Sequence, residues 1–196
     1  MFKIIQLGFL ILMTITFYAC NAQTSNEECQ AKFKRAKKLT YAYPNPVRQS
    51  ALDSALVFVN ESLLCDSNIR KAAVELKITL LITQKKYSEG VIFIDSLVEE
   101  DFTFKYKKKM MKKNFLALNF NSKYDTINRN LVYLEMANEL EQYIRKEDIS
   151  EKEFNEIFVE LYDIKRNFLN VNQIKHEIDS LKGKYPNKID FFSYLY

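Results

Sequence analysis

The chain has 196 residues, of which 47% are hydrophobic and 28% charged, and its formal net charge is +4 at pH 7. This is the composition of one ordinary globular domain with a sizeable core. With 3 Gly and 3 Pro, the sequence lacks the turn residues of a β-sandwich or barrel, and its isolated glycines exclude a phosphate-binding loop. One His and 3 Cys do not supply a zinc site or a catalytic triad, so we expect neither a metal nor a cofactor.

The N-terminus has the layout of an export signal. Lys3 precedes an apolar stretch from Ile4 to about Ile15. This stretch is short for a membrane-spanning helix, which needs about 20 apolar residues. We therefore expect the mature protein to leave the cytoplasm.

The next four residues, Phe17-Tyr18-Ala19-Cys20, resemble the lipobox of bacterial lipoproteins, in which the cysteine is lipidated and becomes the new N-terminus. The resemblance implies a signal peptide over residues 1–19, a lipid on Cys20 and a short tether over residues 20–25. The protein would then be anchored in the bacterial cell envelope and would face the periplasm. Cleavage after Ala22 is the alternative, and it would give a soluble periplasmic protein.

Export also affects how the two remaining cysteines, Cys29 and Cys65, are interpreted. In an oxidising compartment an even pair favours a disulfide, which here would close a loop of about 37 residues. The alternative is two buried free thiols that act as small hydrophobic side chains.

Hydrophobic periodicity and capping residues predict helices along nearly the whole mature chain. We expect eight of them, over residues 26–43, 47–64, 69–84, 87–100, 104–120, 123–145, 151–169 and 170–183. Ser25 and Ser150 each begin a capping box, and Pro44 and Pro186 follow helix ends. Short connections then predict four antiparallel hairpins in a single all-α domain over residues 26–196, with the aromatic tail packed on the last helices.

Two segments of this pattern repeat at an interval of 35 residues. Residues 52–63 (LDSALVFVNESL) and 87–98 (YSEGVIFIDSLV) both resemble the second helix of a tetratricopeptide repeat, a helix–turn–helix unit of 34 residues. In that family small residues lie where helices cross, here Ala55, Ser62 and Gly90. The resemblance implies hairpins stacked as a short α-solenoid, and the alternative is an irregular helical bundle.

Less regular copies of the pattern extend the resemblance toward the C-terminus. They comprise Tyr124, Ile127, Leu131 and Leu134 in the sixth expected helix, and Ile174, Ile178 and Leu181 in the eighth. The hairpin arrangement also places Cys29, at the start of the first helix, beside Cys65, at the end of the second. Their Cα atoms would then lie within bridging distance.

Six lysines form the most conspicuous charge cluster: Lys105, Lys107, Lys108, Lys109, Lys112 and Lys113. The family resemblance implies that Lys109, Lys112 and Leu116 face the concave groove in which such repeats bind peptides. The cluster could also meet anionic lipid headgroups, or it could be an ordinary solvated helix face. Nucleic acid is not an expected partner, because an exported protein rarely meets it and the net charge of +4 is small.

No catalytic residues are expected. His176 has no visible partners for a metal or for acid–base chemistry, and we interpret the helical carboxylates as solvated faces. These are Glu135, Glu139, Glu141, Glu156 and Glu160. The expected function is a non-catalytic, membrane-tethered envelope scaffold that binds another envelope protein or peptide. The alternatives are a periplasmic inhibitor or immunity protein for a toxin, and an envelope enzyme on a helical scaffold.

Overall fold

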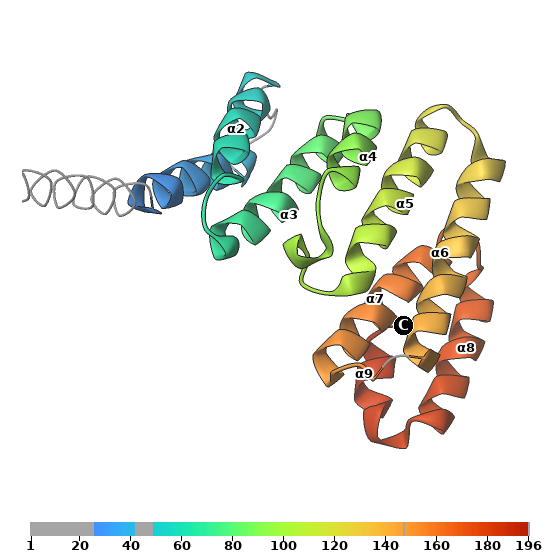
Figure 1. Ribbon diagram of the computed structural model, residues 1–196. Helices are drawn as coiled ribbons and strands as arrows, with labels where there is room; N and C mark the ends of the chain where they lie inside the picture. The colour runs from blue at the N-terminus through green and yellow to red at the C-terminus, as the bar shows by residue number, and fades with distance from the viewer. Residues whose placement is uncertain (1–25, 42–48, 147, 196) are drawn as a thin grey trace, which may run out of the picture. The chain divides into compact units, whose positions relative to one another are not determined.

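The computed structural model describes residues 26–41, 49–146 and 148–195, and every regular element in these ranges is helical (Figure 1). After a first helix over residues 26–41 come α2 (Gln49–Ser62), α3 (Ser67–Thr83), α4 (Tyr87–Asp95), α5 (Lys105–Ser122), α6 (Thr126–Lys146), α7 (Glu151–Lys165), α8 (Val171–Lys184) and α9 (Ile189–Tyr194). Two short 3-10 helices, η1 (Glu99–Asp101) and η2 (Pro186–Lys188), precede α5 and α9. The all-α fold expected from the sequence is confirmed. The signal sequence, Cys20 and the tether lie outside the described residues.

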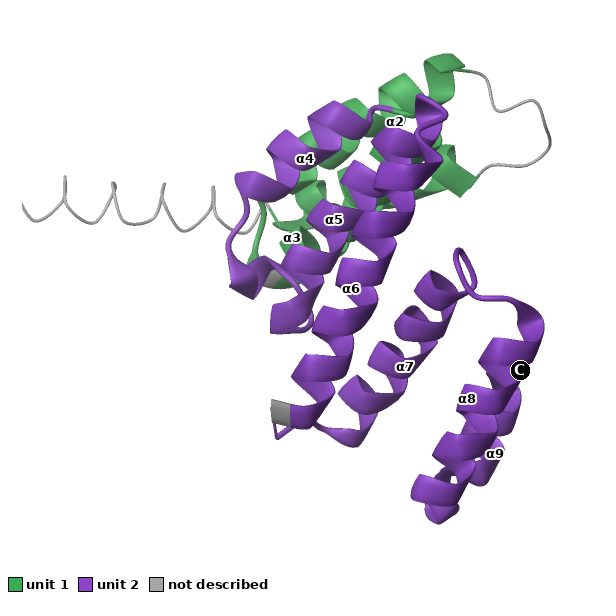
Figure 2. Ribbon diagram, turned by 90° about the vertical axis from the view of Figure 1, so that its right-hand side faces the viewer, with its two compact units in different colours: residues 1–85 green, residues 86–196 purple. Residues whose placement is uncertain are grey.

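The helices form two compact units, residues 1–85 and 86–196 (Figure 2), where the sequence predicts one domain over residues 26–196. The first unit contains the helix over residues 26–41, α2 and α3, and the second contains α4 to α9. Each unit has its own hydrophobic cluster.

In the first unit, small residues let the helices pack closely. Ala55 and Ser62 of α2 are fully buried, as their places at expected helix crossings suggest. Asp66 caps α3 by accepting hydrogen bonds from the backbone N–H groups of Asn68 and Ile69. The buried cluster consists of Ala36, Leu52, Ala55, Val59, Ala73, Leu76 and Leu80.

A disulfide joins the first helix to the end of α2. The Cα atoms of Cys29 and Cys65 lie 6.1 Å apart and their sulfur atoms are bonded. Beside this bond, Lys32 of the first helix forms an ion pair of 3.0 Å with Glu61 of α2. The pairing is the one that the hairpin arrangement predicts.

In the second unit, α4 packs on α5 at a glycine. Gly90 is buried, and a β-carbon added to it would lie 2.2 Å from the ring of Phe115, which is itself buried. Such a distance is far shorter than a van der Waals contact, so the two helices can approach this closely only with glycine at the crossing. This explains a glycine in a helix interior, where it costs about 1 kcal/mol relative to alanine.

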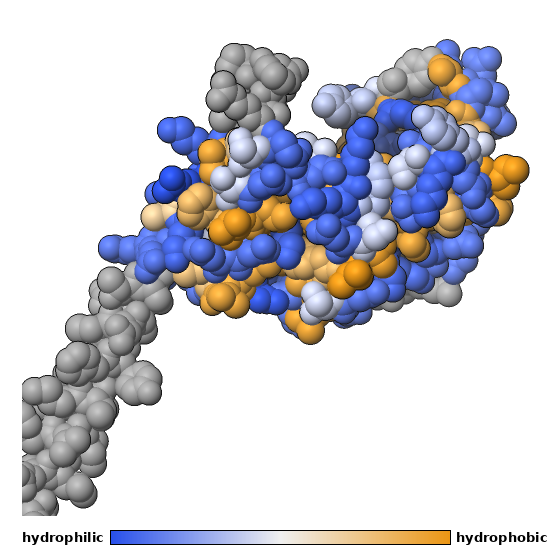
Figure 3. Space-filling view, turned by 90° about the horizontal axis from the view of Figure 1, so that it is seen from above, coloured by the Kyte–Doolittle hydropathy of each residue, from blue (hydrophilic) through white to orange (hydrophobic). Residues whose placement is uncertain are grey.

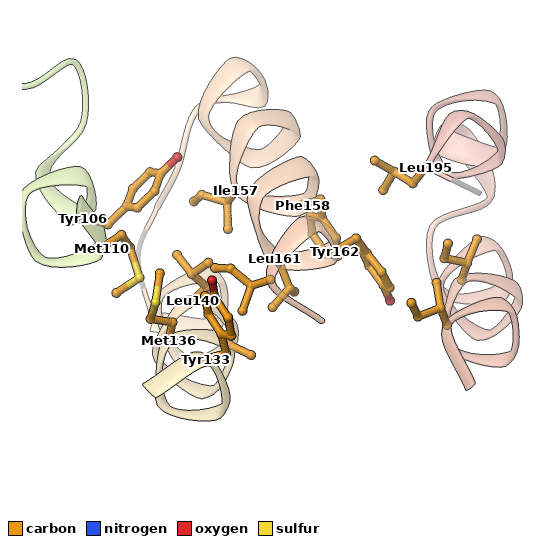
Figure 4. Packing of buried hydrophobic residues seen from close by; sticks show 14 of the residues in the cluster. Tyr106, Met110, Tyr133, Met136, Leu140, Ile157, Phe158, Leu161, Tyr162 and Leu195 are labelled. Atoms are coloured by element: carbon orange, nitrogen blue, oxygen red, sulfur yellow. The ribbon is translucent and has the colours of Figure 1, made fainter. Parts of the chain in front are cut away.

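The core of the second unit is built around α7, whose side chains reach in two directions. Figure 4 shows Ile157 and Leu161 directed toward α5 and α6, whereas Tyr162 points toward α8. All three are almost completely buried. Ser150 caps α7 by accepting a hydrogen bond from the backbone N–H of Glu153.

The C-terminal residues pack on the last helices, as expected. Phe192 of α9 is fully buried and lies edge-on to Phe158 of α7, with ring centroids 5.2 Å apart. Tyr185 packs on the same two rings. Aromatic pairs of this kind contribute about 0.5–1.5 kcal/mol each beyond the area they bury, so α9 is a structural part of the unit.

The face that α6 buries differs from the expectation. The repeat pattern pairs Tyr124 with Ile127, Leu131 and Leu134, yet all four side chains are exposed. The buried side chains are instead Tyr133, Met136, Ala137 and Leu140. The physical reason is that α6 packs on both α5 and α7, and these two neighbours together decide which face is buried.

Two expected helices end earlier than their periodicity suggests. α4 ends at Asp95, where the sequence predicts a helix to residue 100, and α7 ends at Lys165, where it predicts 169. After α4 the chain bends into η1, and the Asp101 carboxylate accepts a hydrogen bond from the backbone N–H of Val98. On the face that Figure 3 shows, hydrophobic side chains are interspersed with hydrophilic ones.

Candidate functional site

A groove runs between α5 and α7, with α6 beneath it, and we call it the α5–α7 groove. Its volume is about 570 Å³, within the range typical of ligand sites. The lining residues are Lys107, Met111 and Asn114 of α5, Tyr133 and Met136 of α6, Asn155, Glu156, Val159, Glu160, Asp163 and Ile164 of α7, and Asn167 after it. The groove lies entirely within the second unit.

Helical spacing explains how these side chains come together. On α5, Lys107, Met111 and Asn114 are four and three residues apart, which places them on one face. On α7, Glu156, Glu160 and Asp163 share the same spacing. Each helix also buries an apolar stripe in the core, so the groove side chains are held on well-anchored helices.

Lys107 lies within the groove and is held by two carboxylates. Its Nζ donates a hydrogen bond to Glu160 at 3.1 Å and lies 3.6 Å from a carboxylate oxygen of Glu156. The side chains of Lys107 and Glu160 are 22% and 17% exposed, so their attraction is screened less than that of a surface pair. Asp163 is paired only with Arg166 of its own turn, at 2.5 Å.

One amide of the groove has an unused acceptor. The Oδ1 atom of Asn155 is buried and has no hydrogen-bond partner. A buried acceptor without a partner costs about 1–3 kcal/mol of free energy. Because the atom is covered, a ligand N–H would reach it only after the Asn155 side chain turns toward the groove. Asn114 and Asn167 add two more amides, each with donors and an acceptor.

The candidate residues taken from the lysine cluster lie elsewhere. Lys109, Lys112 and Leu116 do not line the α5–α7 groove. Lys109 forms an ion pair with Glu139 at 2.8 Å, and Lys112 forms one with Asp95 at 2.7 Å. The expected role of Lys109, Lys112 and Leu116 in partner binding stays a prediction.

Most of the cluster forms contacts within the protein. Lys113 bridges Glu135 and Glu139 of α6, at 2.9 and 3.1 Å, and Lys108 donates a hydrogen bond to the backbone carbonyl of Leu97. Burial disfavours the charged form of Lys113, but its hydrogen bonds to the two glutamates outweigh this effect and raise its pKa. These lysines therefore join α5 to its neighbours and do not form a free basic patch.

The groove residues that sequence reasoning missed are amides and carboxylates of α7. Glu156 and Glu160 appear above only as members of a solvated face, and Asn155 and Asp163 do not appear at all. One signal could have found them: polar residues recur at helical spacing beside the apolar positions 157, 158 and 161. That signal predicts an exposed face, but it does not show that the face borders a groove.

A second cavity, of about 460 Å³, is lined by residues of α6, α7 and α8, and one of these residues is the buried Lys165. The side chain of Lys165 is 10% exposed and pairs with Glu141 at 2.8 Å and Glu177 at 2.5 Å. Tyr162 donates a hydrogen bond of 3.3 Å to Glu177, and burial together with that carboxylate raises the tyrosine's pKa. His176 also lines this cavity and is exposed. The network links three helices, and its charged and polar groups pair with one another.

Two searches of the described residues bear on other kinds of site. Within residues 26–41, 49–146 and 148–195, no group of three or more His, Cys, Asp or Glu side chains is arranged to hold a metal ion. In the same ranges, no helix combines the length and the apolar character needed to cross a membrane.

The described residues define an all-α protein of packed helices, and its second unit has a mixed polar and apolar groove between α5 and α7. Comparison of the chain with known protein families, with curated proteins and with solved structures finds no match. The function must therefore be argued from the groove itself.

Proposed function

We propose that this protein is a non-catalytic scaffold of the bacterial cell envelope that binds a segment of another protein in the α5–α7 groove. The observation that carries the proposal is the groove's lining. Apolar side chains such as Met111 and Val159 lie beside amides and charged groups, all on helices anchored in one core. This combination is typical of surfaces that recognise polypeptides, because it can bury side chains and satisfy backbone groups together.

The proposal includes tethering to a membrane through a lipid on Cys20, in keeping with the signal-like N-terminus. The disulfide between Cys29 and Cys65 supports export, since such bonds persist in oxidising compartments. The resemblance to tetratricopeptide repeats supports a binding role, and the packing at Gly90 agrees with the part played by small residues in that family.

The experiment is affinity capture of the tagged full-length chain from detergent-solubilised envelopes after crosslinking in living cells. Val159→Arg fills the groove with a long charged side chain and should abolish capture of the partner. Val171→Arg is the matched control, because Val171 is an exposed valine on α8 outside the groove. Both variants should keep the wild-type urea midpoint.

A single partner at near-equal amount, lost in Val159→Arg and kept in Val171→Arg, supports the proposal. If that partner is a toxin, the protein is an inhibitor or immunity protein that uses the same groove. A partner captured equally by both variants, or no partner where a known complex survives, contradicts it. The tether has a separate test, in which Cys20→Ser should remove labelling by a radioactive fatty acid.

A further inference from the structure

We infer that the α5–α7 groove takes an extended, basic segment of polypeptide, and that Glu156 and Glu160 hold a lysine or arginine side chain of that segment. The inference rests on the proposed function, because it names the chemistry of what the groove binds. It depends on three observations: the charge of the lining, the position of Lys107 and the amide groups along the groove.

The charge of the lining is negative. Glu156, Glu160 and Asp163 project three carboxylates from one face of α7. Lys107 of the lining and Arg166 beside the groove, which pairs with Asp163, supply two cations against them. The chain's formal net charge of +4 comes from residues 1–85, because residues 86–196 hold 18 Lys and Arg against 19 Asp and Glu. The second unit thus presents no net positive charge that would repel a basic segment, and the carboxylates of the groove attract one.

The position of Lys107 shows that the carboxylates accept an ammonium group. Its Nζ makes its hydrogen bond to Glu160 and lies farther from Glu156, at 3.6 Å. An ionised carboxylate has about four acceptor positions, so the two glutamates can hold a second cation or exchange Lys107 for it. Glu156, the more exposed of the two at 38%, is the first that an incoming side chain would meet.

The amides favour an extended segment over a helical one. A helix satisfies its own backbone N–H and C=O groups, whereas an extended chain presents them for hydrogen bonding. Asn114, Asn155 and Asn167 line the groove, and the Oδ1 of Asn155 is a buried acceptor without a partner. A backbone N–H of the bound segment would satisfy it once the Asn155 side chain turns that oxygen toward the groove.

The test measures binding of three fluorescein-labelled decapeptides to the full-length chain in detergent by fluorescence polarisation. The peptides share one sequence of alanine, serine and glycine with lysine, glutamine or glutamate at every third position. We expect the lysine peptide to bind at least about tenfold more tightly than the glutamate peptide, and its affinity to fall as salt is added. Non-specific attraction to a protein of net charge +4 would give the opposite order.

Variants locate the binding site. Glu156→Gln/Glu160→Gln should weaken the lysine peptide about tenfold, since it removes both carboxylates and keeps their size. Lys107→Met should strengthen binding several-fold, because it removes the cation that competes for them. Glu89→Gln/Glu100→Gln is the matched control, as both glutamates are exposed and lie outside the groove, and it should bind within twofold of wild type.

The outcomes separate the inference from the function on which it rests. Equal binding of the three peptides, or an equal loss in the groove and control variants, overturns the basic-segment inference. If the glutamine or glutamate peptide binds best and Val159→Arg abolishes it, the groove binds polypeptide but the inference is wrong. If no peptide binds at millimolar concentration while Val159→Arg still removes a captured cellular partner, the groove functions but its ligand is not a basic segment. The salt series on the wild-type chain tests the inference even where a variant fails to fold.

Discussion

A β-carbon at position 90 would lie 2.2 Å from a ring carbon of Phe115. We therefore predict that Gly90→Ala destabilises the protein, although alanine is the better helix former. Displacing a packed ring costs about 1–3 kcal/mol, and the helix propensity of alanine returns about 1 kcal/mol, so the net loss should be up to about 2 kcal/mol. Urea denaturation of the full chain measures it.

The control for this prediction is the glycine of α8. A β-carbon at Gly183 would meet nothing within 4 Å, so Gly183→Ala should leave stability unchanged or raise it by up to about 1 kcal/mol. If Gly90→Ala is as stable as Gly183→Ala, then α4 does not approach Phe115 of α5 as closely as described above.

The disulfide between Cys29 and Cys65 should stabilise the first unit. The cysteines are separated by 36 residues, and in the chain-entropy model removing such a bond costs roughly 3–4 kcal/mol. We predict that Cys29→Ser/Cys65→Ser increases hydrogen exchange in α2 and α3, while exchange in α6 and α7 stays at its wild-type rate. Unchanged exchange in α2 would show that the bond contributes little. Non-reducing mass spectrometry should find the bridged peptide in the wild type.

The buried Lys165 should be essential for the packing of α6, α7 and α8. Lys165→Met removes the cation nearest to Glu141 and Glu177, although Glu141 also lies 3.6 Å from Arg145. Breaking a fully buried pair costs about 3–5 kcal/mol, and because both glutamates are about a third exposed we expect a loss of about 1–3 kcal/mol. Lys182→Met is the control, because Lys182 pairs with Asp179 at 3.5 Å on the surface and should change stability by less than about 0.5 kcal/mol. Similar urea midpoints for the two variants would contradict the prediction.

The pH dependence of this network follows from the pKa of Lys165. Burial lowers this pKa, but the hydrogen bonds to Glu141 and Glu177 outweigh burial, so the pKa is raised above 10.5. A raised pKa in the folded state means that the contribution is complete below pH 10.5 and is lost as the pH rises through the folded value. The stability difference between wild type and Lys165→Met should thus stay constant from neutral pH to about pH 10 and then shrink.

Protonation of Glu139 should contribute to the unfolding of the protein in acid. Burial raises its pKa, but Lys109 and Lys113 outweigh burial, so the pKa lies below 4.5. The contribution of this carboxylate is present above pH 4.5 and is lost as the pH falls through the folded value. Glu139→Gln should be less stable at neutral pH by about 1 kcal/mol and should lose less stability below pH 4.5. Glu89→Gln, an exposed control, should follow the wild-type curve throughout.

Local patterns were enough to predict several features of the fold. Capping residues and apolar spacing gave the helices to within a few residues, as at Ser150 and α7. Small residues at helix crossings pointed to close packing at Gly90, and cysteine positions at the two ends of a hairpin pointed to the disulfide. Each of these depends on residues near one another in sequence or on one pair of adjacent helices.

Features that depend on three or more helices were not predicted correctly. The buried face of α6 is set by α5 and α7 together, so the apolar spacing of Ile127, Leu131 and Leu134 was misleading. The partners of the lysines of α5 also depend on the neighbouring helices. Nothing in the sequence shows that Lys107 pairs with Glu160 in the groove, whereas Lys109 and Lys112 pair with Glu139 and Asp95. The expected role of Lys109, Lys112 and Leu116 in partner binding stays a prediction.

The order of helices, their caps and the pairing of Cys29 with Cys65 thus follow from the amino-acid sequence, because they are local or involve a single hairpin. The groove, its charge and the neutralisation of the lysine cluster follow from packing, because they arise where α5, α6 and α7 meet. The partner of each lysine of α5 is decided by which carboxylate a neighbouring helix places within about 4 Å of it, as Glu160 of α7 for Lys107 and Glu139 of α6 for Lys109.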